Sequence, residues 1–140
     1  MDYAMIGPAC VLGLACIGSS IGCGIASMAS HAVMSRVEEN HGFFIGVTSA
    51  SASQTIYGLV LMMMMRNALH AGTLSPMSGI GIGVFVGLAL MLSSIYQGMC
   101  AASGIQASAK QPAIRGKCLA ALAIVETFSI FAFVFALSLF

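Results

Sequence analysis

The chain has 140 residues, of which 59% are hydrophobic and only 6% are charged, with a formal net charge of +1. This composition lies far from that of a soluble globular domain, so water is not its main solvent. The sequence has no basic patch with interleaved aromatic residues, which excludes nucleic acid as a predicted partner. The longest polar connection covers only residues 31–41, so any chemistry that consumes ATP must belong to another protein.

Long stretches almost free of charge predict transmembrane helices. They lie near residues 4–30, 42–66, 79–107 and 114–140. Crossing a hydrocarbon core of about 30 Å takes about 20 helical residues, so each stretch is long enough. Continuous apolar stretches favour helices over a membrane barrel, whose strands alternate in polarity. The sequence therefore predicts an all-α, multi-pass integral membrane protein with four helices in the lipid bilayer.

Charged residues mark the ends of these helices. Asp2 stands where a secretory signal would carry basic residues, so the first apolar stretch is interpreted as a retained helix. The loops 30–41 and 108–117 hold four of the five basic residues, and the opposite side holds only Arg66. By the positive-inside rule both loops are expected in the cytoplasm and both termini outside. The very short ends and loops favour a prokaryotic plasma membrane.

An internal repeat relates the two halves of the chain. A shift of 74 positions places Ile6-Gly7 over Ile80-Gly81, Gly13-Leu14-Ala15 over Gly87-Leu88-Ala89 and Ser19-Ser20-Ile21 over Ser93-Ser94-Ile95. A change of two residues in the loop then brings Gln54 over Glu126. The repeat predicts two fused helical hairpins in the same orientation, covering residues 1–70 and 71–140.

Glycines crowd the first helix of each hairpin. They are Gly7, Gly13, Gly18, Gly22 and Gly24, then Gly79, Gly81, Gly83, Gly87 and Gly98. Several of them recur at a spacing of four residues, which lets helix backbones approach closely in lipid. One or two such pairs suffice for an ordinary tight bundle. The continuous small faces therefore predict a crowded inner ring in which many copies of the chain pack side by side.

Glu126 is the one ionisable residue in the interior of a predicted membrane helix. No lysine or arginine in another helix interior pairs with it, so it must be protonated, hold a cation, or briefly meet a cation from another protein. Ser53 and Gln54 are expected at the same depth on the second helix, Tyr57 lies one turn beyond them, and Gln97 lies near the middle of the third helix.

These polar neighbours favour a bound cation. A proton needs only a carboxylate and one acceptor, whereas a small hard cation such as Na⁺ needs several oxygens in place of its water shell. The alternative that the serine and the glutamines only join helices by hydrogen bonds stays open.

The chain resembles the four-helix proteolipid that forms the membrane rotor, the K or c-type subunit, of V/A-type rotary ATPases. The resemblance covers essentially the whole chain. It rests on the repeated glycine-rich helices, the Lys110-Gln111-Pro112 loop and the Val125-Glu126-Thr127 motif. The segment Ser53-Gln54-Thr55-Ile56-Tyr57-Gly58 is similar to a polar stretch of the sodium-transporting members.

This resemblance implies a sodium site on specific residues. The implied ligands are the Ser53 hydroxyl, Gln54, Gln97, Glu126 and the backbone carbonyl of Ala50, with Tyr57 hydrogen-bonding the glutamate to lock the loaded site. Two residues depart from the family pattern. Ser53 stands where threonine is expected, and Tyr96 stands where the first repeat has Gly22. Neither departure removes an implied ligand.

The resemblance also implies partners and a mode of action. A homo-oligomeric ring would turn against a stator membrane subunit that supplies an arginine, and the chain itself would not be catalytic. Central stalk subunits would meet the cytoplasmic loops that hold Arg36, Glu38, Glu39, Lys110 and Arg115. The first hairpin carries Gln54 where the second carries Glu126, so each chain would transport one ion.

Three alternatives differ in function. The same rotor would carry H⁺ in place of Na⁺. A small four-helix cation exporter would use Glu126 to bind organic cations, but such exporters need an aromatic cage and this chain has no tryptophan. A structural membrane scaffold would transport nothing, and it would not form a large, detergent-resistant ring.

Overall fold

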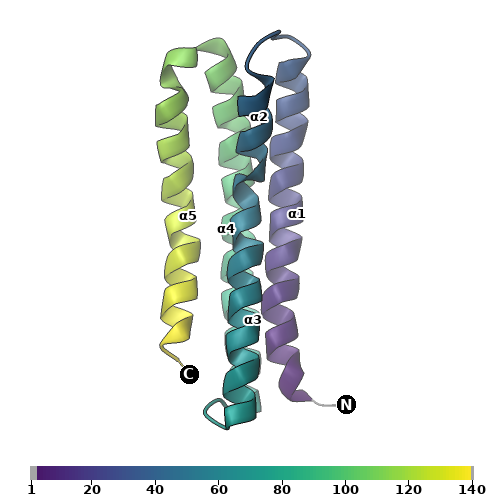
Figure 1. Cartoon of the computed structure of the whole chain (residues 1–140), viewed down its shortest axis with the longest axis vertical. Coiled ribbons are helices and arrows are strands. Elements are labelled where there is room, and N and C mark those ends of the chain that lie inside the picture. Colours follow the sequence, from purple (N-terminus) through teal and green to yellow (C-terminus); the bar gives the residue numbers. More distant parts are fainter. Residues whose placement is uncertain (1–2, 140) are drawn as a thin grey trace.

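The computed structural model describes residues 3–139, so Asp2 lies outside the described part of the chain. Within that part every regular element is helical, and four segments are long and apolar enough to cross a membrane (Figure 1). The segments are Tyr3–Met34, His41–Ala71, Pro76–Lys110 and Pro112–Leu137. The predicted all-α architecture with four membrane helices is confirmed.

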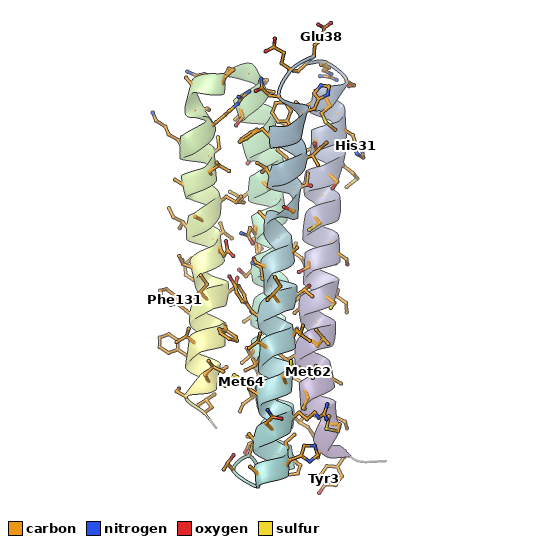
Figure 2. The ribbon with its side chains drawn as sticks, in the orientation of Figure 1. Tyr3, His31, Glu38, Met62, Met64 and Phe131 are labelled. Atoms are coloured by element: carbon orange, nitrogen blue, oxygen red, sulfur yellow. The ribbon has the colours of Figure 1, made fainter. Side chains whose placement is uncertain are left out.

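The chain runs up and down twice (Figure 1). Helix α1, Ile6–Met34, follows a short 3-10 turn, η1 at Tyr3–Met5, and leads to the second segment, which returns toward the end where the chain begins. Helix α4, Pro76–Lys110, then runs parallel to α1, and α5, Arg115–Leu137, returns after the 3-10 turn η3, Pro112–Ile114. Both described ends of the chain therefore lie on one side, and Glu38 lies on the other (Figure 2).

The second segment is helical throughout but contains a 3-10 turn, called the break below, where a continuous α-helix was predicted at 42–66. It consists of α2, His41–Thr48, the 3-10 turn η2, Ser49–Ala52, and α3, Ser53–Ala71. The turn contains neither glycine nor proline. The hydroxyls of Thr48, Ser49 and Ser53 each donate to the carbonyl three residues earlier, at 2.6, 2.8 and 3.1 Å. Such bonds compete with the helix ladder, but Ser20 and Ser103 make the same bond within uninterrupted helices, so these bonds alone do not explain the break.

Helices α1 and α4 pack with their backbones in contact. A Cβ on Gly83 would overlap the carbonyl of Gly7, and a Cβ on Gly98 would overlap that of Gly22. The predicted close approach of helix backbones therefore occurs between the two glycine-rich helices of one chain. By contrast, a Cβ on Gly13, Gly24 or Gly81 would meet nothing within 4 Å, so these glycines face outward from the four-helix bundle.

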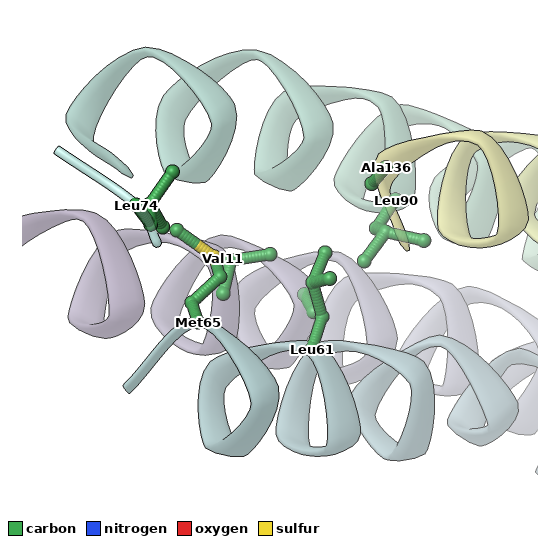
Figure 3. Close-up of a cluster of buried hydrophobic side chains, with 7 residues drawn as sticks. Val11, Leu61, Met65, Leu74, Leu90 and Ala136 are labelled. Atoms are coloured by element: carbon green, nitrogen blue, oxygen red, sulfur yellow. The ribbon is translucent and has the colours of Figure 1, made fainter. Parts of the chain in front are cut away.

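Apolar clusters lie above and below a polar middle layer. The cluster near the termini contains Val11, Ala15, Leu61, Met65, Leu74, Leu90 and Ala136 (Figure 3). A second cluster, toward the loop end, contains Ala26, Ala101 and Leu122. Leu122 lies one turn before Glu126 on α5, so this cluster closes the polar layer from the side of the loops.

Candidate ion-binding site

Glu126 is held by donors from two neighbouring helices. It lies half-buried near the middle of the last membrane segment. The Tyr57 hydroxyl on α3 donates to Glu126 Oε1 at 2.9 Å, and the Gln97 amide on α4 donates to Oε2 over a longer 3.4 Å. The nearest basic residue along α5 is Lys117, about two and a half turns away. Both carboxylate oxygens are therefore engaged by neutral groups.

Gln54 extends this contact into the interior of the bundle. Its side chain is fully buried, and its amide donates to Gln97 Oε1 at 2.5 Å and to Ser129 Oγ at 3.0 Å. Gln97 is almost equally buried. The two amides thus connect α3 to α4, and Gln54 reaches Glu126 through Gln97 with no direct hydrogen bond to it.

Three oxygens gather where the second segment is broken. The Ser53 hydroxyl donates to the carbonyl of Ala50 at 3.1 Å and lies 3.3 Å from Gln54 Oε1. Ala50 belongs to the 3-10 turn η2, and Ser53 begins α3. The break therefore places a backbone carbonyl, a hydroxyl and an amide oxygen together at the depth of the glutamines.

The six residues of the predicted site form one connected set. Their order through space is Ala50, Ser53, Gln54, Gln97, Glu126 and Tyr57. The set offers one carboxylate and several neutral oxygens. A glutamine amide turns its oxygen or its NH₂ toward a neighbour by rotating about its last bond. The arrangement thus suits both an empty carboxylate that needs donors and a monovalent cation that needs acceptors.

Two serines of this layer were not predicted from the sequence. Ser129 Oγ accepts from Gln54 and lies 2.7 Å from Ser93 Oγ, and Ser93 also donates to the Val125 carbonyl at 3.3 Å. Helical spacing was the available signal, since Ser129 follows Glu126 by three residues and Ser93 precedes Gln97 by four. Both serines therefore share a helix face with a site residue.

Tyr96, the departure in the glycine-rich third segment, lies away from this set. Its side chain is 62% exposed, so it does not separate α1 from α4. Tyr57 is different because its ring packs against Phe133 of α5 at 5.6 Å between centroids. This contact holds the Tyr57 hydroxyl on the α5 side of α3, where it reaches Glu126.

Comparison with known families gives a match over most of the chain. A family model that describes the C subunit of ATP synthase matches twice, over residues 6–65 and 80–139. The chain belongs to this family. Family membership and the four apolar helices make it an integral membrane protein, and the predicted resemblance to the V/A-type rotor proteolipids is confirmed.

Two curated relatives are similar over nearly the whole chain. The A-type ATP synthase subunit K of Methanocaldococcus jannaschii is 32% identical over 137 residues, which cover 96% of this chain and 61% of the relative. The V-type sodium ATPase subunit K of Enterococcus hirae is 28% identical over 136 residues, which cover 96% of this chain and 87% of the relative. The chain thus spans about three fifths of the length of the first relative.

Proposed function

We propose that this member of the rotor proteolipid family is the ion-carrying rotor subunit of a V/A-type ATPase and that its Glu126 site carries Na⁺. The observation that supports this most is the buried chain of polar groups from Ser53 through Gln54 and Gln97 to Glu126. The sodium ATPase relative supports the same ion. Hydrolysis of ATP belongs to partner subunits.

The choice of Na⁺ follows from the number of neutral oxygens. A protonated carboxyl group needs one acceptor, whereas the layer around Glu126 offers the Ala50 carbonyl, the Ser53 hydroxyl and two glutamine oxygens. Burying two whole glutamine side chains in a membrane protein costs free energy unless their polar atoms are satisfied. Hydrogen bonds within the layer satisfy these atoms in the structure, and a cation that collects the same oxygens and is balanced by one carboxylate would satisfy the oxygens as well.

Binding of Na⁺ determines whether the Glu126 site can face lipid. A Glu126 that holds Na⁺ is close to neutral, whereas an empty carboxylate in hydrocarbon costs at least about 2.5 kcal/mol. Glu126 lies on α5, which is the least buried of the four membrane segments. Tyr57 donates to one of its oxygens, so a stator arginine that approached this oxygen would have to displace the Tyr57 hydroxyl.

Partner contacts follow from the same proposal. Copies of the chain would form a ring, and an arginine of the stator membrane subunit would compensate Glu126 as the ion leaves. The neutral Gln54 in the first hairpin leaves one carboxylate, and thus one ion, per chain. Transporting one charge against 100 mV requires about 2.3 kcal/mol, which ATP hydrolysis in the soluble motor supplies.

The loop end offers a surface for the central stalk. A cavity of about 420 Å³ lies between the ends of α1 and α4, and Arg36 and Lys110 line it together with Gln106 and apolar residues. Neither cation forms an ion pair within residues 3–139, so an acidic group of a stalk protein has two free basic partners there. The loops would then lie in the cytoplasm, with both termini outside.

A labelling experiment tests the sodium site. A hydrophobic carbodiimide modifies a protonated carboxyl group in a membrane, so Na⁺ at fixed pH should protect Glu126 in the wild-type protein. Choline chloride at the same concentration controls for ionic strength, and Glu126→Gln should remove the labelling altogether. Equal labelling in sodium and choline would contradict Na⁺ and favour H⁺ as the carried ion.

A further inference from the structure

The break in the second membrane segment needs a cause from outside that segment. Residues 49–52 are Ser-Ala-Ser-Ala, without the proline or glycine that usually kinks a helix. Hydroxyl bonds within the segment reach the carbonyls of Ile45, Gly46 and Ala50, but not that of Ser51. The Ser51 carbonyl accepts a hydrogen bond from another helix.

Ser94 of α4 supplies this bond. Its hydroxyl donates to the Ser51 carbonyl at 2.8 Å, and both serine side chains are fully buried. The Ser19 oxygen of α1 lies farther away, at 3.4 Å, so Ser51 is the nearer acceptor for the single proton of Ser94. An inserted side chain of this kind is a recognised cause of a local break in a helix.

Helix α1 closes the turn from the other side. A Cβ on Gly22 would overlap the carbonyl of Ser94 and would lie 2.9 Å from Ser51 Cβ. Because Gly22 has no side chain, the backbone of α1 packs closely against both serines. The turn η2 is held between α1 and α4 by close packing and by one directed hydrogen bond.

We propose that Ser94 is a positioning residue for the ion site, an inference that rests on the proposed function. Ser94 lies one turn before Gln97, and Ser51 directly follows Ala50, whose carbonyl is a proposed ligand. By holding the Ser51 carbonyl, Ser94 keeps η2 in its 3-10 form and keeps the Ala50 carbonyl beside Ser53. Ser94 itself does not contact the ion.

Within a single chain, this contact has no counterpart in the first repeat. The 74-residue shift places Ser20 over Ser94. Within the chain, Ser20 is exposed and donates to the Ile17 carbonyl of its own helix at 2.9 Å. The same residue type in the duplicated helix thus makes only a local bond. The bond from Ser94 to the neighbouring segment arises where the carboxylate site lies.

The test compares Ser94→Ala with Ser103→Ala in the assembled protein. Ser103 lies on the same helix and donates only to its own Cys100 carbonyl at 3.0 Å. For Ser94→Ala we expect the Na⁺ concentration that half-protects Glu126 from carbodiimide to rise about 3- to 10-fold, as for one lost hydrogen bond. Labelling without Na⁺ should stay unchanged, because Glu126 keeps Tyr57 and Gln97. A purely structural defect would alter that labelling as well.

A second variant keeps the test decisive if Ser94→Ala assembles poorly. Ser94→Cys retains the volume and a weak donor, so its half-protection value should lie between those of wild type and Ser94→Ala. If the half-protection value of Ser94→Ala, or of Ser94→Cys where Ser94→Ala assembles poorly, equalled that of Ser103→Ala, the positioning role would be overturned. The proposed sodium site would be unaffected by that result. A wild-type protein that Na⁺ does not protect would instead contradict the proposed function, and the role of Ser94 with it.

Discussion

Tyr57 donates a hydrogen bond to one oxygen of the Glu126 carboxylate. Its hydroxyl donates to Glu126 at 2.9 Å, and its ring is held by Phe133. Tyr57→Phe removes the hydroxyl and keeps the ring contact. Because hydrogen bonds to charged groups are stronger than neutral ones, we expect the Na⁺ concentration for half-protection of Glu126 to rise about tenfold. Carbodiimide titration of Glu126 measures this change.

Tyr96→Phe provides the matched control for that substitution. Tyr96 is exposed, and its hydroxyl donates to no residue within 3–139. The control should therefore behave as the wild-type protein does. If the two tyrosine variants gave the same half-protection value, the hydrogen bond from Tyr57 would have no part in ion binding.

The side chains of the proposed site could be placed together from the sequence because depth along a membrane helix follows from counting residues, whereas the Ala50 carbonyl came only from the family resemblance. Gln54, Gln97 and Glu126 fall at similar depths in three apolar stretches, and polar groups there are rare. Ser93 and Ser129 were missed because serine is a common packing residue in membrane helices. Which serine meets a glutamine depends on how each helix is rotated, and the weak amphipathic character of these helices does not reveal that rotation.

The broken second segment is the element that the sequence did not predict. The four residues of its 3-10 turn include neither glycine nor proline. The hydrogen bond to the Ser51 carbonyl comes from Ser94, 43 residues away. A contact between distant residues of this kind leaves no periodic signal. The glycine-rich helices could be predicted as closely packed, but only the structure shows that most of their small faces meet within one chain.

The contact between α1 and α4 gives a stability prediction. Gly98→Ala would place a Cβ onto the Gly22 carbonyl, so the two helices would have to separate. We expect the free energy of unfolding to fall by about 1–3 kcal/mol, as in other overpacked interiors. Thermal unfolding in detergent measures this effect. Gly42→Ala, where a Cβ meets nothing within 4 Å, should leave stability unchanged, and an equal loss in both variants would contradict the packing.

Arg115 joins the two hairpins at the loop end. Its guanidinium donates to Asn40 Oδ1 at 3.1 Å and lies 5.1 Å from the centre of the Phe43 ring. Arg115→Lys keeps the charge but loses the planar donor group. We expect a loss of about 1 kcal/mol of stability, measured by thermal unfolding. Lys117→Arg, on the exposed part of α5, should change nothing, and equal melting of the two variants would refute this contact.

The orientation of the whole molecule can be tested with its two lysines. Lys110 and Lys117 are the only lysines of the chain, and both lie at the loop end. The proposed orientation places this end in the cytoplasm. A membrane-impermeant amine reagent should therefore leave both lysines unmodified in intact cells and should modify them in inverted vesicles stripped of the soluble subunits, as mass spectrometry of lysine peptides would show. Modification in intact cells would reverse the orientation.

The central claim concerns the whole assembly and depends on a single side chain. Glu126→Gln keeps the shape of the side chain and removes the charge that would balance an ion. ATP-driven uptake of ²²Na⁺ into vesicles, measured with the complete ATPase rebuilt around this variant, tests the claim most directly. We predict that uptake is abolished while the ring still assembles. Uptake at the wild-type rate would show that Glu126 does not carry the ion.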